Sequence, residues 1–439
     1  MIKLYPHQKD VLEQTTQFNR VGYFLEMGLG KTYVGSEKMI QLNNKLNNIN
    51  LVICQKSKVK DWVEHFKNNY NCIVDDITTK KGMSHFFEMK WQSEDIVPIE
   101  QIVPLIGIIN YDLAFRRAEL GKLTDFTLML DESSLIQHKT TQRSKFVLNK
   151  LKPKNVILLS GTPSSGKYEN LWTQCKLLGY DISEELFLKQ YVNFKNIDTD
   201  VGIKKIVDKD NPYKNFERLK RKLADFGAVF MKTEEVMDLP EQNFIIKKSS
   251  KTKAYTKFMK KSIVNVDDGV TLVGDTRLTK RLYSRQLCGM YNEERYSMVK
   301  ELLESTNDRM VIFYNFNAEL EQLKVICEEL DKPISQVNGS VKDLDNFENI
   351  DNTVLLVQYQ AGAMGLNLQK ANKIIYFSLT ESSDLFEQSK KRIHRIGTTQ
   401  PCFYYILMCE NSVEEDIYKS LLLKQDYNDA LFEKLEEKE

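Results

Sequence analysis

Residues 21–32 read Val-Gly-Tyr-Phe-Leu-Glu-Met-Gly-Leu-Gly-Lys-Thr, an apolar run followed by two glycines and a Lys-Thr pair. An amphipathic stretch over residues 33–42 comes directly after it. Strand, glycine loop, Lys-Thr and helix form the sequence context of a phosphate-binding loop. In such a loop, Gly28 and Gly30 allow backbone N–H groups to close around phosphate oxygens. The alternative interpretation is a glycine turn that only starts a helix.

The Lys-Thr pair gives this loop its expected chemistry. Lys31 would neutralise the β- and γ-phosphates of ATP, and the Thr32 hydroxyl would ligate Mg²⁺. We therefore predict ATP and Mg²⁺ as cofactors. The predicted ATP site contains Met27, Gly28, Leu29, Gly30, Lys31 and Thr32.

A second apolar run ends in two carboxylates, as Leu128-Met-Leu-Asp131-Glu132-Ser-Ser. The carboxyl ends of strands in an α/β sheet are where ligands bind. Asp131 would hold Mg²⁺ through water, and Glu132 would orient and polarise the water that attacks the γ-phosphate. The alternative is a surface turn that carries two charges.

The stretch Ser160-Gly-Thr-Pro163 follows a third apolar run over residues 156–159. Ser160 and Thr162 are candidates for sensing the γ-phosphate or for linking the ATP site to another site. The alternative interpretation is a simple strand-to-turn junction.

Two arginines near the carboxyl end are candidates for contacting the γ-phosphate. On a helix, Gln388, Arg392 and Arg395 would fall at positions i, i+4 and i+7, on one face. Arginines aimed at the transferring phosphoryl group stabilise its developing charge. A solvated basic helix is the alternative. Upstream, the small residues of 360–368 would allow a ligand to approach the backbone closely, or would form a tight turn.

Short apolar runs alternate with amphipathic stretches in both halves of the chain. Such runs are typical of strands buried on both faces of a parallel sheet. We predict an α/β fold with two tandem domains, at residues 1–240 and 241–439, with short helical insertions at about 165–240 and 250–300 and a hairpin at 263–275. The predicted strands include residues 51–54, 106–109, 126–130, 156–159, 310–313, 354–357, 373–377 and 404–407.

Composition excludes several other classes. The 439 residues carry 62 Lys and Arg against 61 Asp and Glu, a net charge of +1. Nucleic-acid binding would therefore need local basic clusters such as 218–222 and 247–253.

No apolar run approaches the roughly 20 residues of a membrane span, and no signal peptide opens the chain. The seven cysteines form no CxxC pair. We expect a cytoplasmic protein without a membrane partner.

In their order and spacing, these motifs resemble the Swi/Snf-type branch of helicase superfamily two, from Leu4 to about residue 410. Residues 26–32 resemble the EMGLGKT loop of that family, and residues 160–163 are similar to its TGTP motif. Residues 360–368 resemble its RAGGLGINL stretch, and residues 388–397 match its arginine-finger motif. The resemblance implies that each domain is RecA-like, a mostly parallel sheet flanked by helices.

The resemblance also implies further site residues. Gln8 would contact the adenine, and Gly365 would contact ATP. Ser160, Thr162, Gln388 and His394 would couple the ATP site to movement, although His394 has the alternative of a core histidine. Contacts to DNA are implied for Lys56, Ser57, Tyr111, Gln360 and Gly362.

One departure from the family concerns the acidic motif, where Ser133 and Ser134 stand in place of Ala-His or Gly-His. It puts in doubt the coupling attributed to that histidine. The chain looks like a minimal ATP-dependent translocase or helicase of the sort found in phage or bacterial genomes, which implies a bacterial or phage-infected cell. It would couple ATP hydrolysis between two RecA-like domains to movement on double-stranded DNA. It would bind the DNA through phosphates and work with a replication, recombination or repair protein. The alternatives are a strand-separating DNA or RNA helicase, and an ATP-gated DNA-binding module without turnover.

Overall fold

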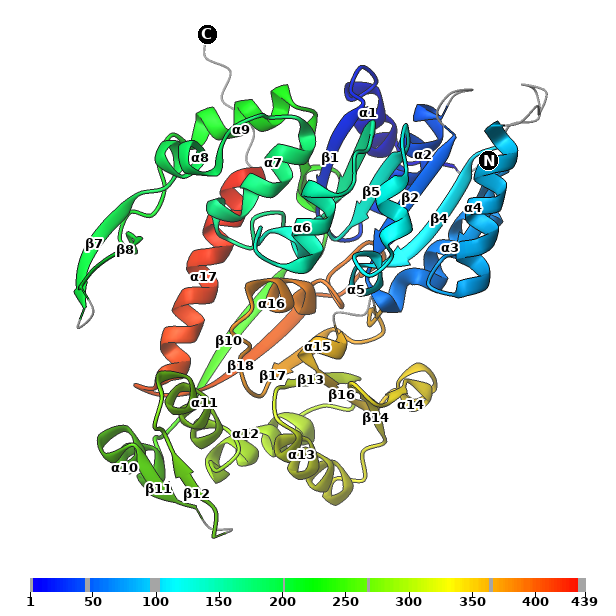
Figure 1. Cartoon of the computed structure of the whole chain (residues 1–439). Coiled ribbons are helices and arrows are strands. Elements are labelled where there is room, and N and C mark those ends of the chain that lie inside the picture. The colour runs from blue at the N-terminus through cyan, green and yellow to red at the C-terminus, as the bar shows by residue number, and fades with distance from the viewer. Residues whose placement is uncertain are drawn as a thin grey trace. The chain divides into compact units, whose positions relative to one another are not determined.

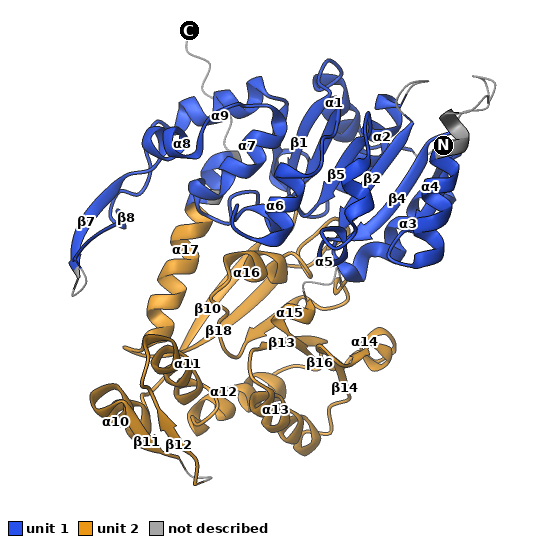
Figure 2. Ribbon diagram, in the orientation of Figure 1, with its two compact units in different colours: residues 1–236, 427–439 blue, residues 237–426 orange. Residues whose placement is uncertain are grey.

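The computed structural model describes residues 3–43, 48–94, 103–199, 202–266, 269–362 and 366–432 (Figure 1). The chain divides into two compact units, residues 1–236 with 427–439 and residues 237–426 (Figure 2). Each unit contains one seven-stranded sheet. The domain limits that we predicted, 1–240 and 241–439, stay a prediction.

The sheet of unit 1 has the strand order β3-β4-β2-β5-β6-β1-β9, and every neighbouring pair is parallel. Its strands are β1 (Arg20–Leu25), β2 (Ile49–Cys54), β3 (Ile73–Asp76), β4 (Leu105–Asn110), β5 (Thr127–Asp131), β6 (Asn155–Leu159) and β9 (Ala228–Met231). The helices are α1 (Pro6–Gln14), α2 (Lys31–Leu42), α3 (Val59–Asn69), α4 (Lys80–Glu94), α5 (Tyr111–Ala114), α6 (Gln142–Asn149), α7 (Trp172–Leu178), α8 (Glu184–Tyr191) and α9 (Phe216–Asp225).

The central strands of unit 1 are buried on both faces because successive side chains enter different cores. In β2, Leu51 and Ile53 belong to one hydrophobic cluster, whereas Val52 and Cys54 belong to the other. This alternation is what a strand covered by helices on both sides requires. The continuous apolar runs in the sequence are therefore explained by two cores of one sheet.

The sheet of unit 2 has the order β10-β18-β17-β13-β16-β14-β15 and is parallel except at β15, which pairs antiparallel with β14. Its strands are β10 (Gln242–Ser249), β13 (Met310–Tyr314), β14 (Ile334–Val337), β15 (Lys342–Asp343), β16 (Val354–Gln358), β17 (Lys373–Tyr376) and β18 (Cys402–Cys409). The helices are α10 (Lys253–Lys261), α11 (Arg277–Cys288), α12 (Glu293–Glu304), α13 (Asn317–Glu329), α14 (Asp345–Asn349), α15 (Tyr359–Gly362), α16 (Ser383–Lys390) and most of α17 (Val413–Phe432), whose residues from Tyr427 on belong to unit 1.

Unit 2 repeats the two-core arrangement. Val311 and Phe313 of β13 face one cluster, and Met310, Ile312 and Tyr314 face the other. Two mostly parallel sheets flanked by helices confirm the predicted fold class of two tandem RecA-like domains.

The segments expected as insertions are only partly helical. Within the segment 165–240, helices α7, α8 and α9 are joined by the antiparallel hairpin β7 (Phe194–Thr199) and β8 (Gly202–Val207). β9 in the same segment pairs with β1 of the main sheet. The short helical insertion over this segment stays a prediction, like the domain limits. The hairpin predicted at 263–275 is confirmed as β11 (Ile263–Asn265) and β12 (Thr271–Val273). Across the described ranges, no helix has the length and apolarity that a membrane crossing requires.

Candidate functional site

The phosphate-binding loop predicted from the sequence joins β1 to α2. Gly28 and Gly30 have φ angles of +98° and +76°, in the left-handed region that favours glycine. The Lys31 ammonium donates to the carbonyl oxygen of Leu25 at 2.8 Å. A Cβ atom at Gly161 would lie 3.5 Å from Lys31 Nζ, so the loop and the Ser-Gly-Thr-Pro stretch are neighbours.

Helix α1 is anchored on this loop by two side chains. The Gln8 amide donates to the carbonyl oxygen of Leu29 at 3.1 Å, and His7 Nε2 lies 3.2 Å from the same oxygen. Both side chains are buried. Gln8, the predicted adenine contact, is thus held against the loop that we predict binds the phosphates.

Gly30→Ala should weaken ATP binding strongly. The new methyl group would lie 2.1 Å from the amide nitrogen of Gln8, and the backbone φ of +76° would also be strained. A left-handed conformation costs a non-glycine residue about 1–2 kcal/mol, and the displaced Gln8 would add to this cost. We expect the Kd for ATP, measured by titration with a fluorescent ATP analogue, to rise by about 10-fold or more.

Gly269→Ala is a matched control for this variant. Its φ is +69°, but a Cβ atom there would meet nothing within 4 Å. It should lower thermal stability slightly and leave the Kd for ATP unchanged. Equal ATP affinity in the Gly30→Ala variant and the wild type would show that the loop does not contact the nucleotide.

The predicted acidic pair lies at the end of β5. The Trp62 indole donates to Asp131 Oδ2 at 2.8 Å, and the Tyr111 hydroxyl donates to the Asp131 backbone oxygen at 2.9 Å. Burial raises the pKa of the Asp131 carboxyl, and the Trp62 hydrogen bond and the positive charge of Lys31 oppose this rise. The carboxyl group therefore lies within the electrostatic reach of the loop lysine.

The donor set of this region fits Mg²⁺. The ion prefers oxygen ligands and usually takes one or two from the protein, completing its shell with phosphate oxygens and water. Asp131 and the Thr32 hydroxyl supply oxygens of this kind. Within the described ranges, no three His, Cys, Asp or Glu side chains cluster as a metal cage.

Glu132 has an unusual backbone conformation. Its φ of +54° is left-handed, and it stands directly before the short 3₁₀ helix Ser133–Ile136. Non-glycine residues in this region cost about 1–3 kcal/mol and gather at functional sites. The strain supports the prediction that Glu132 has a chemical role.

A buried hydrogen-bond chain joins the acidic motif to the Ser-Gly-Thr-Pro stretch. The Ser133 hydroxyl donates to Gln174 Oε1 at 2.7 Å, and the Gln174 amide donates to the Pro163 carbonyl oxygen at 2.6 Å. Ser133 and Gln174 are both fully buried. The serine that replaces the family residue at position 133 is thus connected to the neighbouring strand end. We call Ser133, Gln174 and Pro163 the serine–glutamine relay.

The arginine motif of unit 2 does not form the expected helix. Helix α16 ends at Lys390, and residues 391–397 form successive turns. The chain must turn there to enter β18, and Gly397 supports the turn with a φ of +98°. The Thr398 hydroxyl also caps the Ile393 carbonyl oxygen at 2.6 Å. The predicted helical face for Gln388, Arg392 and Arg395 is therefore wrong.

The side chains of this motif differ in exposure. Arg392 and His394 are buried, whereas Gln388 and Arg395 are partly exposed. Burial lowers the pKa of Arg395. His394 Nε2 lies 2.8 Å from the Pro240 carbonyl oxygen, just before β10, so it fixes the motif to its own unit.

The predicted DNA contacts separate into exposed and buried residues. Lys56, Ser57 and Gln360 are exposed. Tyr111 is 3% exposed, and its hydroxyl donates to the backbone oxygen of Asp131. A Cβ atom at Gly362 would lie 2.8 Å from Val357, so this glycine is closely packed. The DNA contacts of both residues stay predictions.

Ser160 and Gly365 are two further predicted site residues. Ser160 is buried, and its hydroxyl accepts from the Thr162 backbone N–H at 3.2 Å. Gly365 lies outside the described residues.

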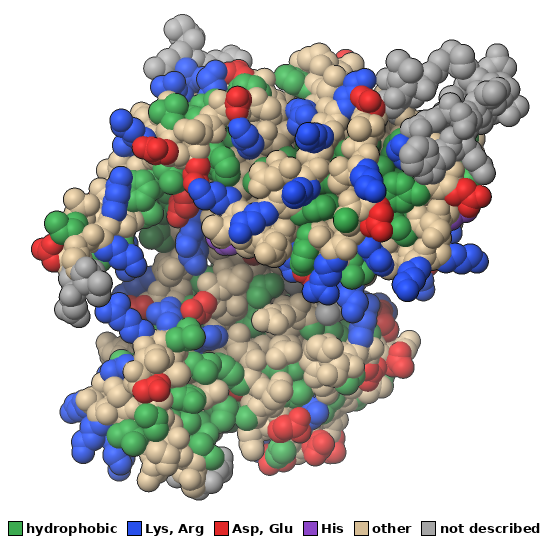
Figure 3. All heavy atoms as spheres, viewed as in Figure 1, with side chains coloured by type: hydrophobic (Ala, Val, Ile, Leu, Met, Phe, Trp, Pro, Cys, Tyr) green, Lys and Arg blue, Asp and Glu red, His purple; other side chains and the backbone are tan. Residues whose placement is uncertain are grey.

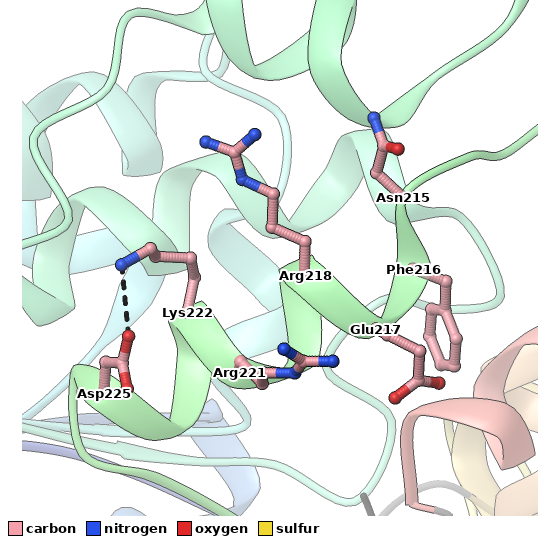
Figure 4. Close-up of a pocket in the computed structure, with 7 residues that line it drawn as sticks. All are labelled: Asn215, Phe216, Glu217, Arg218, Arg221, Lys222 and Asp225. Atoms are coloured by element: carbon pink, nitrogen blue, oxygen red, sulfur yellow. Dashed lines mark hydrogen bonds and ion pairs between the residues drawn. The ribbon is translucent and has the colours of Figure 1, made fainter. Parts of the chain in front are cut away.

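One surface hollow in unit 1 has a basic lining but no predicted site residue (Figure 4). It lies along α9, where the Lys222 ammonium pairs with Asp225 at 3.1 Å. Lys220 of the same basic cluster is buried and lies 5.1 Å from the centre of the Phe216 ring. The lining residues are Asn215, Phe216, Glu217, Arg218, Arg221, Lys222 and Asp225. All come from one short stretch, which is typical of an open surface feature.

Three features of the site were not predicted from the sequence: the contact of His7, the buried Gln174 and the hydrogen bond from Trp62 to Asp131. No local pattern marks Gln174, because its partners lie 41 and 11 residues away in the sequence. His7 stands next to Gln8 within the opening motif, so its position beside the predicted adenine contact could have indicated a role in the site.

A parallel sheet with a glycine-lysine loop after one strand and Asp-Glu at the end of another defines the P-loop class. Comparison with family models identifies the branch. The SNF2-related domain matches residues 11–295, and the helicase conserved C-terminal domain matches residues 294–397. The chain belongs to the SNF2-related family.

Individual relatives are distant and longer. The helicase/translocase-type protein YwqA of Bacillus subtilis is 23% identical over 447 residues, covering 93% of this chain and 46% of YwqA. The ISWI chromatin-remodeling complex ATPase ISW1 of Saccharomyces cerevisiae is 23% identical, covering 89% of this chain and 37% of ISW1. The chain thus spans less than half the length of these relatives. The solved Sulfolobus solfataricus SWI2/SNF2 ATPase core in complex with dsDNA is 21% identical, covering 98% of this chain and 92% of that chain, with a TM-score of 0.43.

Proposed function

We propose that this chain hydrolyses ATP and couples the hydrolysis to movement along double-stranded DNA. The observation that carries the proposal is the order β5-β6-β1 in the sheet of unit 1. These three adjacent parallel strands are followed by Asp131-Glu132, by residues 160–163 and by the glycine-lysine loop. Their chemical groups therefore share one edge of the sheet, where α/β proteins bind ligands.

The chain's own residues suffice for the main steps of phosphoryl transfer. Lys31 would exchange its contact with the Leu25 carbonyl oxygen for a phosphate oxygen, and the loop N–H groups would hold the neighbouring phosphates. Glu132 would orient the attacking water and accept its proton. Asp131 and Thr32 would hold Mg²⁺, which would supply positive charge that neutralises the phosphates.

Arg392 and Arg395 are proposed as the arginines that stabilise the transition state. Arginines of this kind increase the rate by about 10³–10⁵. Because Arg392 is buried and Arg395 is partly exposed, Arg395 is the better candidate for a direct phosphate contact, and Arg392 for holding the motif in place. Ser160, Thr162, Gln388 and His394 would link this chemistry to movement.

The proposed DNA contacts are phosphate contacts. Lys56 and Ser57 are exposed at the end of β2, and Gln360 is exposed after β16. Contacts of this type depend on salt and carry little sequence information. The names of the relatives, which describe a helicase/translocase and a chromatin-remodeling ATPase, support a nucleic-acid substrate.

The proposal predicts that double-stranded DNA stimulates the steady-state ATPase rate by about 10-fold or more, and single-stranded DNA and RNA much less. The assay compares the three nucleic acids with none, and a triplex-displacement assay then tests movement directly. Preferential stimulation by single strands or RNA would favour the strand-separating helicase. An absence of turnover with every nucleic acid would favour an ATP-gated binding module.

A further inference from the structure

Between β10 and α12, unit 2 contains a small module with a core of its own. It consists of α10, the β11–β12 hairpin and α11, which we call the insertion module, residues 250–266 and 269–288. Its inward side chains form a separate hydrophobic cluster with the end of β18, including Tyr255, Phe258, Val264, Leu272 and Leu287. The module is thus a folded platform whose outer side chains are not needed for its own core.

The outer surface of the insertion module is strongly basic. Its sequence, 250–288, has nine Lys or Arg and three Asp, a net charge of +6 in a chain whose total is +1. Six of these basic residues are exposed and form no ion pair among the residues that the structure describes. They are Lys251, Lys253, Lys257, Lys260, Lys261 and Arg277.

The same module exposes an unusual share of apolar side chains. Seventeen large hydrophobic side chains are exposed in the described parts of the chain, and six of them belong to this module. Leu278 is the most exposed, at 80%. The six are Met259, Ile263, Val270, Val273, Leu278 and Leu282. A contiguous exposed apolar patch on a soluble protein usually marks an interaction site.

Several of these apolar residues are neighbours on the module. Ile263 and Val273 are opposite each other in the β11–β12 ladder, so their side chains share one face of the hairpin. Leu278 and Leu282 are one turn apart on α11. Figure 3 shows hydrophobic side chains gathered over the hairpin and α11, with Lys and Arg at the border over α10.

We propose that the insertion module is a docking surface for an acidic, amphipathic segment of a partner protein. The apolar residues would be buried at the centre of the contact, and the lysines of α10 would pair with carboxylates at its rim. This division into an apolar centre and a polar rim is the usual anatomy of a protein interface. Because the module is positively charged, it would attract a negatively charged partner. Long-range electrostatic attraction would also increase the association rate.

The apolar patch is what favours a protein over a nucleic acid. A duplex would use the lysines, but its phosphates and sugars would leave Leu278 and the hairpin residues without an apolar partner. An acidic segment with an apolar side satisfies both kinds of side chain. The inference is independent of the proposed translocation, since docking requires no ATP hydrolysis.

The test measures binding of a labelled synthetic helical peptide of about 20 residues, with Glu and Asp on one side and Leu and Phe on the other. The full chain should bind it with a micromolar Kd and bind a scrambled peptide of equal composition much more weakly. Leu278→Ser with Leu282→Ser should raise the Kd by about 10-fold or more. Lys257→Gln with Lys260→Gln should raise it by a few-fold and reduce its salt dependence.

The matched control is Leu186→Ser with Ile203→Ser, which changes two apolar residues of unit 1 that are 46% and 74% exposed. It should leave peptide binding unchanged. ATP hydrolysis without nucleic acid should stay the same in all these variants, so a failure of the docking proposal is separate from a failure of the proposed function. Circular dichroism checks that each variant is folded.

Four outcomes would overturn the inference. The first is no peptide binding up to about 100 μM, and the second is equal binding of the scrambled peptide. The third is displacement of the peptide by a DNA duplex whose own binding is lost in the lysine variant, which would make the module a nucleic-acid surface. The fourth is a dimer of the chain that the Leu278 and Leu282 variant dissociates, because a second copy would then cover the patch.

Discussion

Glu132→Gln should lower kcat for ATP hydrolysis by about 10²–10⁴-fold while leaving the Kd for ATP nearly unchanged. The amide keeps the shape of the carboxylate but cannot accept the proton of the attacking water. Because Asp131, Lys31 and the glycine loop are untouched, nucleotide binding should persist. The variant should therefore accumulate in its ATP-bound form.

The measurement pairs a steady-state ATPase assay with nucleotide titration. Glu88→Gln, which changes an exposed glutamate on α4 of the same unit, is the matched control and should behave like the wild type. A Glu132→Gln variant that hydrolyses ATP at the wild-type rate would remove Glu132 from the chemical step. The left-handed backbone at this position would then need another explanation.

Arg295→Met should destabilise unit 2 by about 3–5 kcal/mol, the largest stability effect that we expect for an exchange of one side chain. Arg295 is fully buried, and its guanidinium donates to Glu414 Oε1 at 2.8 Å and to the Phe377 carbonyl oxygen at 3.0 Å. Burial would lower the pKa of Arg295, but the Glu414 carboxylate raises it beyond its ordinary value. Without the arginine, a buried carboxylate loses its counter-charge.

Amide hydrogen exchange in β13 and β17 is the suitable measurement, because all three tryptophans of the chain lie in unit 1 and their fluorescence reports on that unit. The matched control on the same helix is Lys300→Met. Lys300 pairs with Glu329 at 2.9 Å, but both side chains are exposed, and such pairs contribute about 0–1 kcal/mol. If Arg295→Met and Lys300→Met lowered the stability of unit 2 equally, burial of the ion pair would not explain the effect.

Adding Glu414→Leu to Arg295→Met should restore part of the lost stability. Removing both charges leaves no unpaired ion in the core, so the double variant should be less unstable than the sum of the two single variants. A fully additive result would mean that the two side chains act through separate contacts.

The central strands could be predicted from the sequence, whereas the edge strands could not. β2, β5, β6 and β13 are continuous apolar runs because both of their faces are covered. β3 reads Ile-Val-Asp-Asp and lies at an edge of its sheet, where carboxylates are tolerated. Its pattern is too short and too polar to distinguish it from a loop.

The same difference applies to the candidate site. The glycine-lysine loop and the Asp-Glu pair are local patterns. Adjacent residues determine both their chemistry and their backbone geometry, so both could be predicted from the sequence. The end of α16 depends instead on contacts made after folding, such as the Thr398 hydroxyl on the Ile393 carbonyl oxygen. Helical spacing alone therefore predicted that Gln388, Arg392 and Arg395 share one helical face, but the helix ends before the two arginines.

Tertiary contacts also set the surroundings of two buried residues. Tyr111 and Gly362 stand in motifs whose resemblance implies DNA contacts, yet the Tyr111 hydroxyl binds a backbone oxygen and Gly362 of α15 packs closely against Val357 of β16. The place of a residue within a motif indicates in which part of the fold the residue lies. The direction of each side chain is set by packing, which a single sequence does not reveal.

The serine–glutamine relay has a consequence for how the chain responds to its surroundings. A hydroxyl and an amide keep one protonation state across the physiological pH range, whereas a histidine changes charge near neutrality. The family pattern has its histidine at the position of Ser134, next to the relay. Between the Ser133 hydroxyl and the Pro163 carbonyl oxygen, the relay consequently contains no group that titrates near neutrality. Its two hydrogen bonds should be as well formed in an acidified cell as in a neutral one.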